Sequence, residues 1–274
     1  MKPNDLTLVT GLWNIKREEL VGFHRKFDHY LDCFQKLLKL DFNFYIYVPE
    51  EVLEFAVNNT HSKNTFIHYK SLDTIKSEFG LFDQVQKIRT NPEWYGLNGW
   101  LGESTQAQLE YYNPIVMSKM GFLSDAAFNN PFKSEYLFWI DAGIANSVSP
   151  EFIKNLRHIK NYMESIYNKF LLLSFLYESP YEVHGFESNA FNRYCDVELS
   201  QYVCRGGFFG GTPKDCLELN KQYDLILEKS INEELMGTEE NILTILSHKF
   251  PDKIHRYELP DSLVYSFFID LDKK

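Results

Sequence analysis

The sequence has few cysteines, and none of them stands in a Cys-x-x-Cys pair. Four cysteines in 274 residues are too few for a disulfide scaffold, and their spacing excludes the common zinc and redox sites. We therefore expect all four to be reduced and to fill the core. They are Cys33, Cys195, Cys204 and Cys216.

Long apolar runs are also missing. The longest, Phe170 to Tyr177, contains Ser174 and is far shorter than the ~20 residues of a membrane-spanning helix. The first residues, Met1 to Thr7, include Asn4 and Asp5 where a secretion signal would be apolar. We expect a cytoplasmic protein with no membrane span and at most peripheral contact with the cytoplasmic face of the inner membrane.

Basic residues are in the minority, because 28 Lys and Arg stand against 38 Asp and Glu, a net charge of −10. Such a surface repels phosphate backbones, so nucleic acid is excluded as the expected partner. An anionic small molecule would need a local cation, backbone amides or a metal. Hydrophobic residues make up 44% of the chain, enough for a sizeable core, and the 16% of aromatic residues also suits stacking on sugars or bases.

Short β-branched or aromatic runs alternate with helical periodicity in the first part of the chain. Leu6 to Leu12, Asn43 to Val48 and Thr65 to Tyr69 are predicted strands. Glu18 to Leu40 and Glu50 to Val57 are predicted helices between them. This alternation predicts an α/β fold with a mostly parallel central sheet flanked by helices.

The second part continues this pattern. Tyr136 to Ile140 shows no alternation, as expected of a central strand buried on both faces, and Leu171 to Leu176 is a second buried strand. No repeat or flexible linker occurs, so one domain is expected. The other expected elements are a structured loop at 91–103, a long helical region at 104–128, a loop at 177–196, and helices at 213–229 and 239–249.

Asp141 follows the buried strand Tyr136 to Ile140 directly, at the edge where open α/β sheets bind ligands. Its carboxylate suits Mg²⁺ or Mn²⁺, which would neutralise a diphosphate. Alternatively, Asp141 only caps the following turn. Gly143 permits a positive φ and a close approach of ligand to backbone, or is an ordinary turn glycine.

Glycines and acids mark two later segments. Four of the six residues from Gly206 to Gly211 are glycines, which indicates either close approach of substrate to the backbone or a tight kink in a strand. Thr238 precedes Glu239 and Glu240 as a predicted helix N-cap. The two acids either stabilise the first turn or serve as base, nucleophile or acceptor clamp in transfer to a hydroxyl.

Four cationic or titratable side chains remain candidates. Lys119, with apolar neighbours in a predicted helix, is either a surface lysine or a cation directed at phosphate. His184 either faces solvent or hydrogen-bonds a substrate hydroxyl. His248 and His255 have weaker claims, and either would complete a metal shell.

Three segments together, Leu8 to Trp13, Trp139 to Gly143 and Gly207 to Gly211, resemble the bacterial HtrL/YibB-type (WlaTC/HtrL) glycosyltransferases over most of the chain. The resemblance implies the GT-A fold of nucleotide-diphospho-sugar transferases. It also implies a role in building capsule or lipooligosaccharide. A nucleotide-binding half at 1–143 and an acceptor-binding half at 144–274 would then share one domain.

A more distant similarity is to the blood-group-type α-galactosyl and α-N-acetylgalactosaminyl transferases, which carry a similar Gly-x-Phe-Phe-Gly-Gly followed by an acidic pair. The similarity implies that Glu240 lies beneath the transferred sugar, that Lys119 replaces a donor-binding arginine and that His184 contacts the acceptor. Those enzymes carry Asp-x-Asp, whereas this chain has Asp141-Ala142-Gly143. Either His255 helps Asp141 to bind a metal, or the enzyme needs none.

The resulting prediction is a glycosyltransferase that moves a sugar from a nucleotide diphosphate donor, such as a UDP-sugar, to a glycan hydroxyl. A divalent metal, Mn²⁺ or Mg²⁺, would act as Lewis acid on the leaving diphosphate. The predicted site residues are Glu239 and Glu240 for catalysis; Thr10, Gly11, Leu12, Arg17, Lys119, Asp141, Ala142 and Gly143 for the donor; His184, Gly207, Phe208, Phe209 and Gly210 for the substrate; and Asp141 and His255 for the metal.

Two other functions remain open. A sugar-phosphate nucleotidyltransferase would use a similar α/β fold, but it needs a Gly- and Arg-rich phosphate loop, and Trp13 to Arg17 contains no glycine. A non-catalytic carbohydrate-binding protein of the same fold would tolerate replacement of Asp141 and Glu240.

Overall fold

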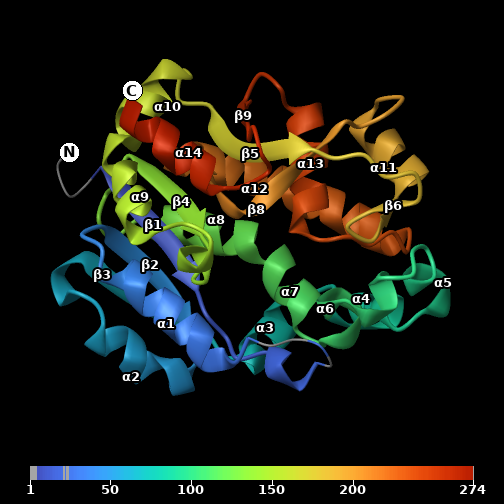
Figure 1. Ribbon diagram of the computed structural model, residues 1–274, viewed down its shortest axis with the longest axis horizontal. Helices are drawn as coiled ribbons and strands as arrows, with labels where there is room; N and C mark the ends of the chain where they lie inside the picture. The colour runs from blue at the N-terminus through green and yellow to red at the C-terminus, as the bar shows by residue number, and fades with distance from the viewer. Residues whose placement is uncertain (1–4, 21, 23–24, 274) are drawn as a thin grey trace.

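A seven-stranded sheet lies at the centre of the computed structural model, which describes residues 5–20, 22 and 25–273 (Figure 1). The strand order is β3-β2-β1-β4-β8-β5-β9, and only β8 runs antiparallel to its neighbours. The predicted α/β class with a mostly parallel sheet is therefore confirmed. The strands are β1 (Leu6–Gly11), β2 (Asn43–Val48), β3 (Thr65–Tyr69), β4 (Tyr136–Ile140), β5 (Phe170–Leu176), β8 (Tyr202–Gly211) and β9 (Ile254–Glu258), and a separate hairpin contains β6 (Glu182–Val183) and β7 (Phe186–Glu187).

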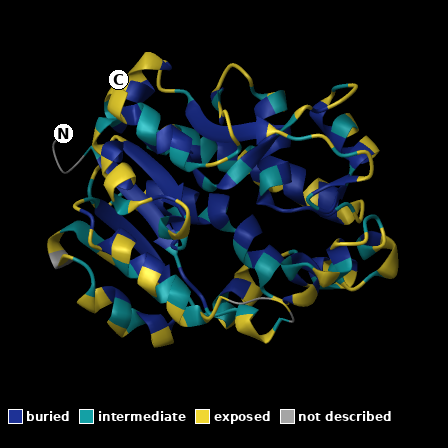
Figure 2. Ribbon diagram, in the orientation of Figure 1, coloured by how far each residue is buried: buried dark blue, intermediate teal, exposed yellow. Residues whose placement is uncertain are grey.

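Helices cover both faces of the sheet, and the strands form the buried centre of the molecule in Figure 2. α8 packs on β4, α13 packs on β8, and α12 lies against both of these helices. The helices are α1 (Phe27–Leu38), α2 (Glu50–Asn58), α3 (Leu72–Glu78), α4 (Phe82–Arg89), α5 (Pro92–Tyr95), α6 (Thr105–Gln108), α7 (Tyr112–Met117), α8 (Lys119–Asn129), α9 (Pro150–Ile153), α10 (Ile159–Ser165), α11 (Ser188–Cys195), α12 (Pro213–Asn232), α13 (Glu239–Lys249) and α14 (Tyr265–Asp270).

Aromatic side chains from β4, β8 and α14 fill the core beside the sheet. Phe138 and Phe208 stack with ring centroids 5.0 Å apart, and Phe208 also contacts Phe267 and Phe268. Every residue of β4 is buried, as its unbroken apolar sequence predicts. The four cysteines are buried and free of disulfides, and no helix in the described residues is long and apolar enough to cross a membrane.

The helix predicted at Glu18 to Leu40 begins only at Phe27. Gly22 interrupts it with φ +80°, a left-handed conformation that ends regular helix, and Arg17–Glu19 forms a separate 3₁₀ turn. The part of this prediction at 21, 23 and 24, like residues 1–4 and 274, lies outside the described residues.

The helical region predicted at 104–128 is divided into α6, α7 and α8. Leu109 adopts an extended conformation after α6, and Pro114 in the first turn of α7 has no N–H to continue an earlier helix. The loop predicted at 177–196 contains the β6–β7 hairpin and α11. Glu187 caps α11 by accepting from Asn189 N and Ala190 N, a local signal that the prediction missed.

Candidate functional site

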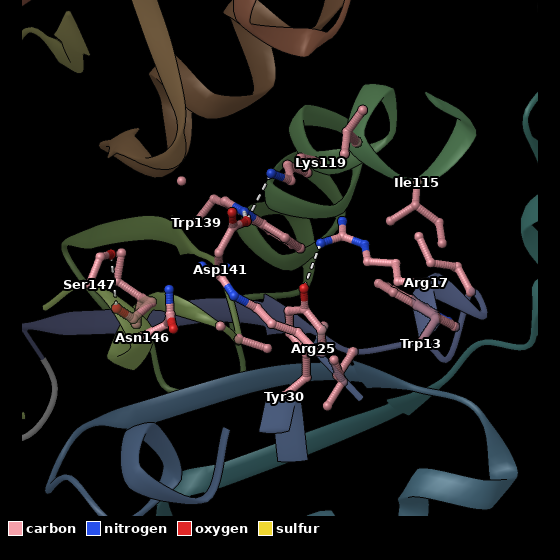
Figure 3. A pocket seen from close by; sticks show the side chains of 18 of the residues that line it. Trp13, Arg17, Arg25, Tyr30, Ile115, Lys119, Trp139, Asp141, Asn146 and Ser147 are labelled. Atoms are coloured by element: carbon pink, nitrogen blue, oxygen red, sulfur yellow. Dashed lines mark hydrogen bonds and ion pairs between the residues drawn. The ribbon is translucent and has the colours of Figure 1, made fainter. Parts of the chain in front are cut away.

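The strand order reverses beside β1. The chain passes from β1 outward to β2 and β3 and then returns to β4 on the other side of β1, which makes a topological switch point. Ligands of open α/β sheets bind at such points, beyond the carboxyl ends of the strands. A pocket of about 450 Å³ lies there, and its lining includes residues that directly follow β1 and β4 (Figure 3).

Lys119, the first residue of α8, forms a buried charge cluster at this pocket. Its Nζ lies 2.8 Å from Asp141 Oδ1 and 2.8 Å from Glu239 Oε1. It also donates to the Gly206 carbonyl at 3.1 Å, so all three of its donors are used within the protein. Burial would lower the pKa of Lys119, but the two carboxylates outweigh it and raise the pKa. Lys119 is therefore neither a surface lysine nor a free cation for phosphate.

Asp141 joins this cluster to the open pocket. Its Oδ1 also accepts from Trp139 Nε1 at 2.7 Å, and its own N–H donates to the Gly207 carbonyl. About 39% of its side chain is exposed, whereas Lys119 is buried. The carboxylate hydrogen-bonds side chains rather than the backbone of the next turn, so the alternative role as a turn cap is wrong. Asp141 presents its second oxygen to the pocket.

Glu239 and Glu240 face different surroundings although they are adjacent. Burial raises the pKa of Glu239 more than Lys119 lowers it. Glu240 Oε1 accepts from Gly206 N–H at 2.9 Å, and its Oε2 lies 2.9 Å from His184 Nδ1. Burial opposes ionisation of Glu240 too, but the hydrogen bond and charge of His184 hold its pKa below the usual range. Glu240 is therefore held as an anion, and it is the one of the two acids that lines the pocket.

Thr238 caps α13 and fixes the direction of the two acids, as the sequence predicts. Its hydroxyl accepts from the N–H of Glu240, and Asn241 Oδ1 accepts from Thr238 N–H at 2.8 Å. Such a capping box satisfies backbone donors that the helix leaves unpaired.

Replacing Thr238 with alanine should therefore lower the free energy of unfolding by about 1 kcal/mol. Thermal unfolding would show a fall in Tm of roughly 3 °C. The matched control is Thr90→Ala, because Thr90 is exposed and its hydroxyl donates to the carbonyls of Gln86 and Lys87 in α4. Equal Tm values for both variants would contradict the cap.

The glycines of β8 are explained by what lies opposite them. A Cβ on Gly206 would overlap the Glu239 carboxylate, and one on Gly210 would overlap the carbonyl of Leu137 in β4. At Gly207 the nearest atom to a Cβ would be Asp141 Oδ2, at 3.6 Å. The run therefore lets β8 approach its neighbours closely, and only Gly207 faces the pocket.

The structure brings most of the predicted donor residues together and separates several others. Thr10 is buried outside the pocket, Phe208 and Phe209 are fully buried core residues, and Gly210 packs on β4, so the predicted substrate contacts of the last three are wrong. Gly143 has φ −84° and needs no left-handed conformation. The predicted residues that line the pocket are Gly11, Leu12, Arg17, Lys119, Asp141, Ala142, Gly143, Gly207 and Glu240.

His255 does not complete a metal shell with Asp141. It pairs with Leu171 in β5, which pairs with Gly210 in β8, which in turn pairs with Phe138 in β4. Three strand spacings of ~4.8 Å place the backbone of His255 about 14 Å to the side of β4, too far for one ion. Its ring lies against the hydroxyl of Tyr162 instead.

The described side chains around Asp141 do not form a complete Mn²⁺ or Mg²⁺ site by themselves. Among the described residues no group of three or more His, Cys, Asp or Glu side chains is placed to hold a metal. Lys119 and Trp139 occupy one oxygen of Asp141, and Mg²⁺ requires about six oxygen ligands. The protein itself offers one carboxylate oxygen here, so a bound ion would take its other ligands from the donor diphosphate and from water.

Arginines supply the cationic side of the pocket. The Arg17 guanidinium donates to Tyr30 Oη (Figure 3). It also lies 5.3 Å from the ring centroids of Tyr30 and Tyr112. Arg25 also lines the pocket. Arg205 packs 3.8 Å over the ring of Phe175, and its Nε is buried without a hydrogen-bond partner in the described part of the chain.

Sequence reasoning missed several of these residues. The sequence could have indicated Arg205, because it lies two residues before Gly207 and a strand places alternate residues on one face. The missed lining residues include Arg25, Tyr30, Asn146, Ser147, Arg205 and residues 262–264.

Comparisons with known proteins place the chain in a family without assigning an activity. A family model described as "Bacterial protein of unknown function (HtrL_YibB)" matches residues 4–259. No curated protein matches. Among solved structures, a 4-diphosphocytidyl-2C-methyl-D-erythritol synthase from Anaerococcus prevotii is similar over 99% of this chain and 96% of its own, with 10% identity and a TM-score of 0.42. That likeness is too weak to indicate a function.

Proposed function

The chain belongs to HtrL_YibB, a family of bacterial proteins of unknown function, and we propose that it is a glycosyltransferase. It would transfer a sugar from a nucleoside diphosphate donor to a hydroxyl of a bacterial surface glycan. The observation that carries this proposal is the pocket at the switch point. Its lining combines the guanidinium groups of Arg17 and Arg25 with the carboxylates of Asp141 and Glu240.

The donor nucleotide suits the side of the pocket formed by residues after β1. A volume of about 450 Å³ lies within the range of small-molecule sites, roughly 300–1,000 Å³. Arg17 presents a planar guanidinium that can pair with two phosphate oxygens. It takes the role that the resemblance gave to Lys119, because Lys119 is already bound to two carboxylates. Positive charge at this place stabilises the diphosphate as it leaves.

The transferred sugar suits the side formed by β4, β8 and α13. The free oxygen of Asp141 can accept from a sugar hydroxyl, and its other oxygen is fixed by Lys119 and Trp139. Glu240 is held as an anion and stabilises positive charge that develops at the anomeric carbon. Gly207 leaves room for the sugar beside both carboxylates.

The experiment is a thermal-shift screen of nucleoside diphosphates and their sugars, UDP-sugars first, each with Mn²⁺ and with EDTA. A ligand at 100 times its Kd stabilises the protein by about 2.7 kcal/mol. We expect one nucleotide class to raise Tm and the matching sugar donor to be consumed. A protein that no nucleotide stabilises, with or without metal, would contradict the proposal. Binding without turnover would favour a carbohydrate-binding protein.

Asp141→Asn tests the role of the carboxylate. The amide keeps the shape and the oxygen that Trp139 and Lys119 contact but loses the negative charge. Turnover should fall by about 10²-fold or more, as for loss of one preorganised electrostatic contact. Asp252→Asn, on an exposed turn, is the matched control and should leave turnover unchanged. Equal turnover by the two variants would show that Asp141 has no part in the reaction.

A further inference from the structure

One nitrogen of His184 is left without a protein partner beside the transfer site. His184 Nδ1 lies 2.9 Å from Glu240 Oε2, and its Nε2 makes no hydrogen bond with any residue that the structure describes. The side chain is 19% exposed. His184 does not line the pocket itself but lies one hydrogen bond beyond Glu240, which does. Nε2 is thus available to a ligand.

The backbone of this hairpin holds His184 in an uncommon conformation. His184 has φ +50° and Gly185 has φ +94°, so a non-glycine residue occupies the left-handed region. A turn of this kind persists where surrounding contacts enforce it. Here Glu182 Oε2 accepts from Gly185 N–H at 2.7 Å, and Trp94 Nε1 donates to the Gly185 carbonyl at 2.9 Å.

More distant contacts fix the hairpin and the ring. Glu182 is buried, and its Oε1 accepts from Asn98 Nδ2 and Trp100 Nε1, both at 3.0 Å. The Tyr177 ring meets the imidazole edge to face, with centroids 5.0 Å apart. Trp94 and Glu182 therefore fix the turn that carries His184, and Tyr177 packs on its ring. A histidine that only faced solvent would not require these contacts.

Glu240 is poorly suited to be the base itself. Both of its oxygens already accept hydrogen bonds, and His184 together with Arg205 lowers its pKa. For His184 the surroundings raise the pKa instead of lowering it. Burial lowers the pKa of the imidazole and Arg205 acts in the same direction, but Glu240 and Glu182 outweigh both and raise it above the usual 6.5. A group that titrates near neutral pH is the more effective proton acceptor.

We propose that His184 Nε2 is the general base that takes the proton from the acceptor hydroxyl, while Glu240 orients the ring through Nδ1–H. This inference rests on the proposed glycosyltransferase function. The hydroxyl oxygen bonds to the anomeric carbon as the bond from that carbon to the phosphate oxygen breaks. The electron pair leaves with the nucleoside diphosphate, and the proton moves to Nε2. Glu240 stabilises the resulting imidazolium. This single displacement inverts the anomeric configuration.

The His184→Asn variant tests whether His184 acts as a base or only as a structural support. Asparagine can still donate to Glu240 but carries no basic nitrogen. Turnover should fall by about 10²- to 10⁴-fold, while the thermal shift with the donor is kept. Added imidazole should restore part of the activity of His184→Ala. His158→Asn, on a half-buried histidine that ends the 3₁₀ turn Lys154–His158 between α9 and α10, is the matched control and should keep full activity.

The pH profile gives a second readout. Turnover by the wild-type protein should fall as pH drops through the raised pKa of His184, because the protonated ring cannot accept a proton. This acidic limb should lie above pH 6.5 and disappear in His184→Asn. A structural role would leave the limb in place.

Two outcomes would overturn the inference alone. The first is a His184→Asn variant with nearly wild-type turnover, and the second is a product whose anomeric proton, followed by NMR, shows retained configuration. Failure of the wild-type protein to bind or consume any nucleotide sugar would instead overturn the proposed function and this inference with it.

Discussion

Replacing Lys119 with methionine should lower the free energy of unfolding by about 4 kcal/mol, the largest stability effect we expect from one substitution at this site. Lys119 is the common partner of Asp141 and Glu239, and its side chain is only 8% exposed. Methionine keeps most of the volume but leaves two carboxylates and the Gly206 carbonyl without their cation. In a chain of this size the loss corresponds to roughly 10 °C in Tm.

Two controls separate this effect from loss of an ordinary ion pair. Lys154→Met breaks an exposed pair with Glu151 and should cost no more than about 1 kcal/mol. Adding Glu239→Gln to Lys119→Met should recover part of the lost stability, because one uncompensated charge is removed. In Lys119→Met alone, the carboxylates without a cation have raised pKa values in the folded state. The stability that this variant loses relative to the wild type should therefore become smaller as pH is lowered towards 5. A deficit equal to that of Lys154→Met would show that the cluster contributes little.

The sequence predicts the fold well where local pattern and sheet geometry agree. The five-residue apolar run of β4 has no alternation and is buried throughout, and Asp141 follows it at the carboxyl edge. Parallel strands align those edges, so Gly11 and Asp141 meet in one pocket although 130 residues separate them. Thr238 is a helix cap that the sequence shows directly. These features depend on short segments and on one general rule of α/β sheets.

The rest of the site depends on register and side-chain direction, which local pattern does not fix. Phe208 and Phe209 were predicted to contact substrate, but β8 runs between two strands, and both rings enter the core. His255 falls on an outer strand because β8 and β5 separate β9 from β4. The His184–Glu240 pair joins a hairpin turn to a helix start 56 residues later, and no periodicity indicates that contact.

This chain lacks Asp-x-Asp, and a cluster around Lys119 occupies the corresponding place. In the resembled transferases two acids share a metal, whereas here the second acid near Asp141 is Glu239, and Lys119 lies between them. A buried lysine offsets both charges without any exchangeable ion. In the proposed reaction, Arg17 and Arg25 would supply the positive charge that the leaving diphosphate needs. The prediction of Mn²⁺ or Mg²⁺ is tested by the EDTA arm of the nucleotide screen.

Gly206→Ala should be nearly as damaging as loss of Lys119, although it adds only one methyl group. The new Cβ would overlap the carboxylate of Glu239, which is buried and held by Lys119, so it cannot turn away into solvent. Either Glu239 leaves Lys119 or β8 moves away from α13. Overpacking of this kind costs about 3 kcal/mol, and we expect a matching fall in the midpoint of urea unfolding.

Gly207→Ala on the same strand is the matched control. Its methyl group would lie 3.6 Å from Asp141 Oδ2, an ordinary contact, so stability should stay within about 0.5 kcal/mol of the wild type. Because Gly207 lines the pocket, this variant should instead weaken the thermal shift with the donor. Gly206→Ala should therefore affect mainly stability, and Gly207→Ala mainly ligand binding. Equal unfolding midpoints for the two variants would show that Glu239 is not fixed against β8.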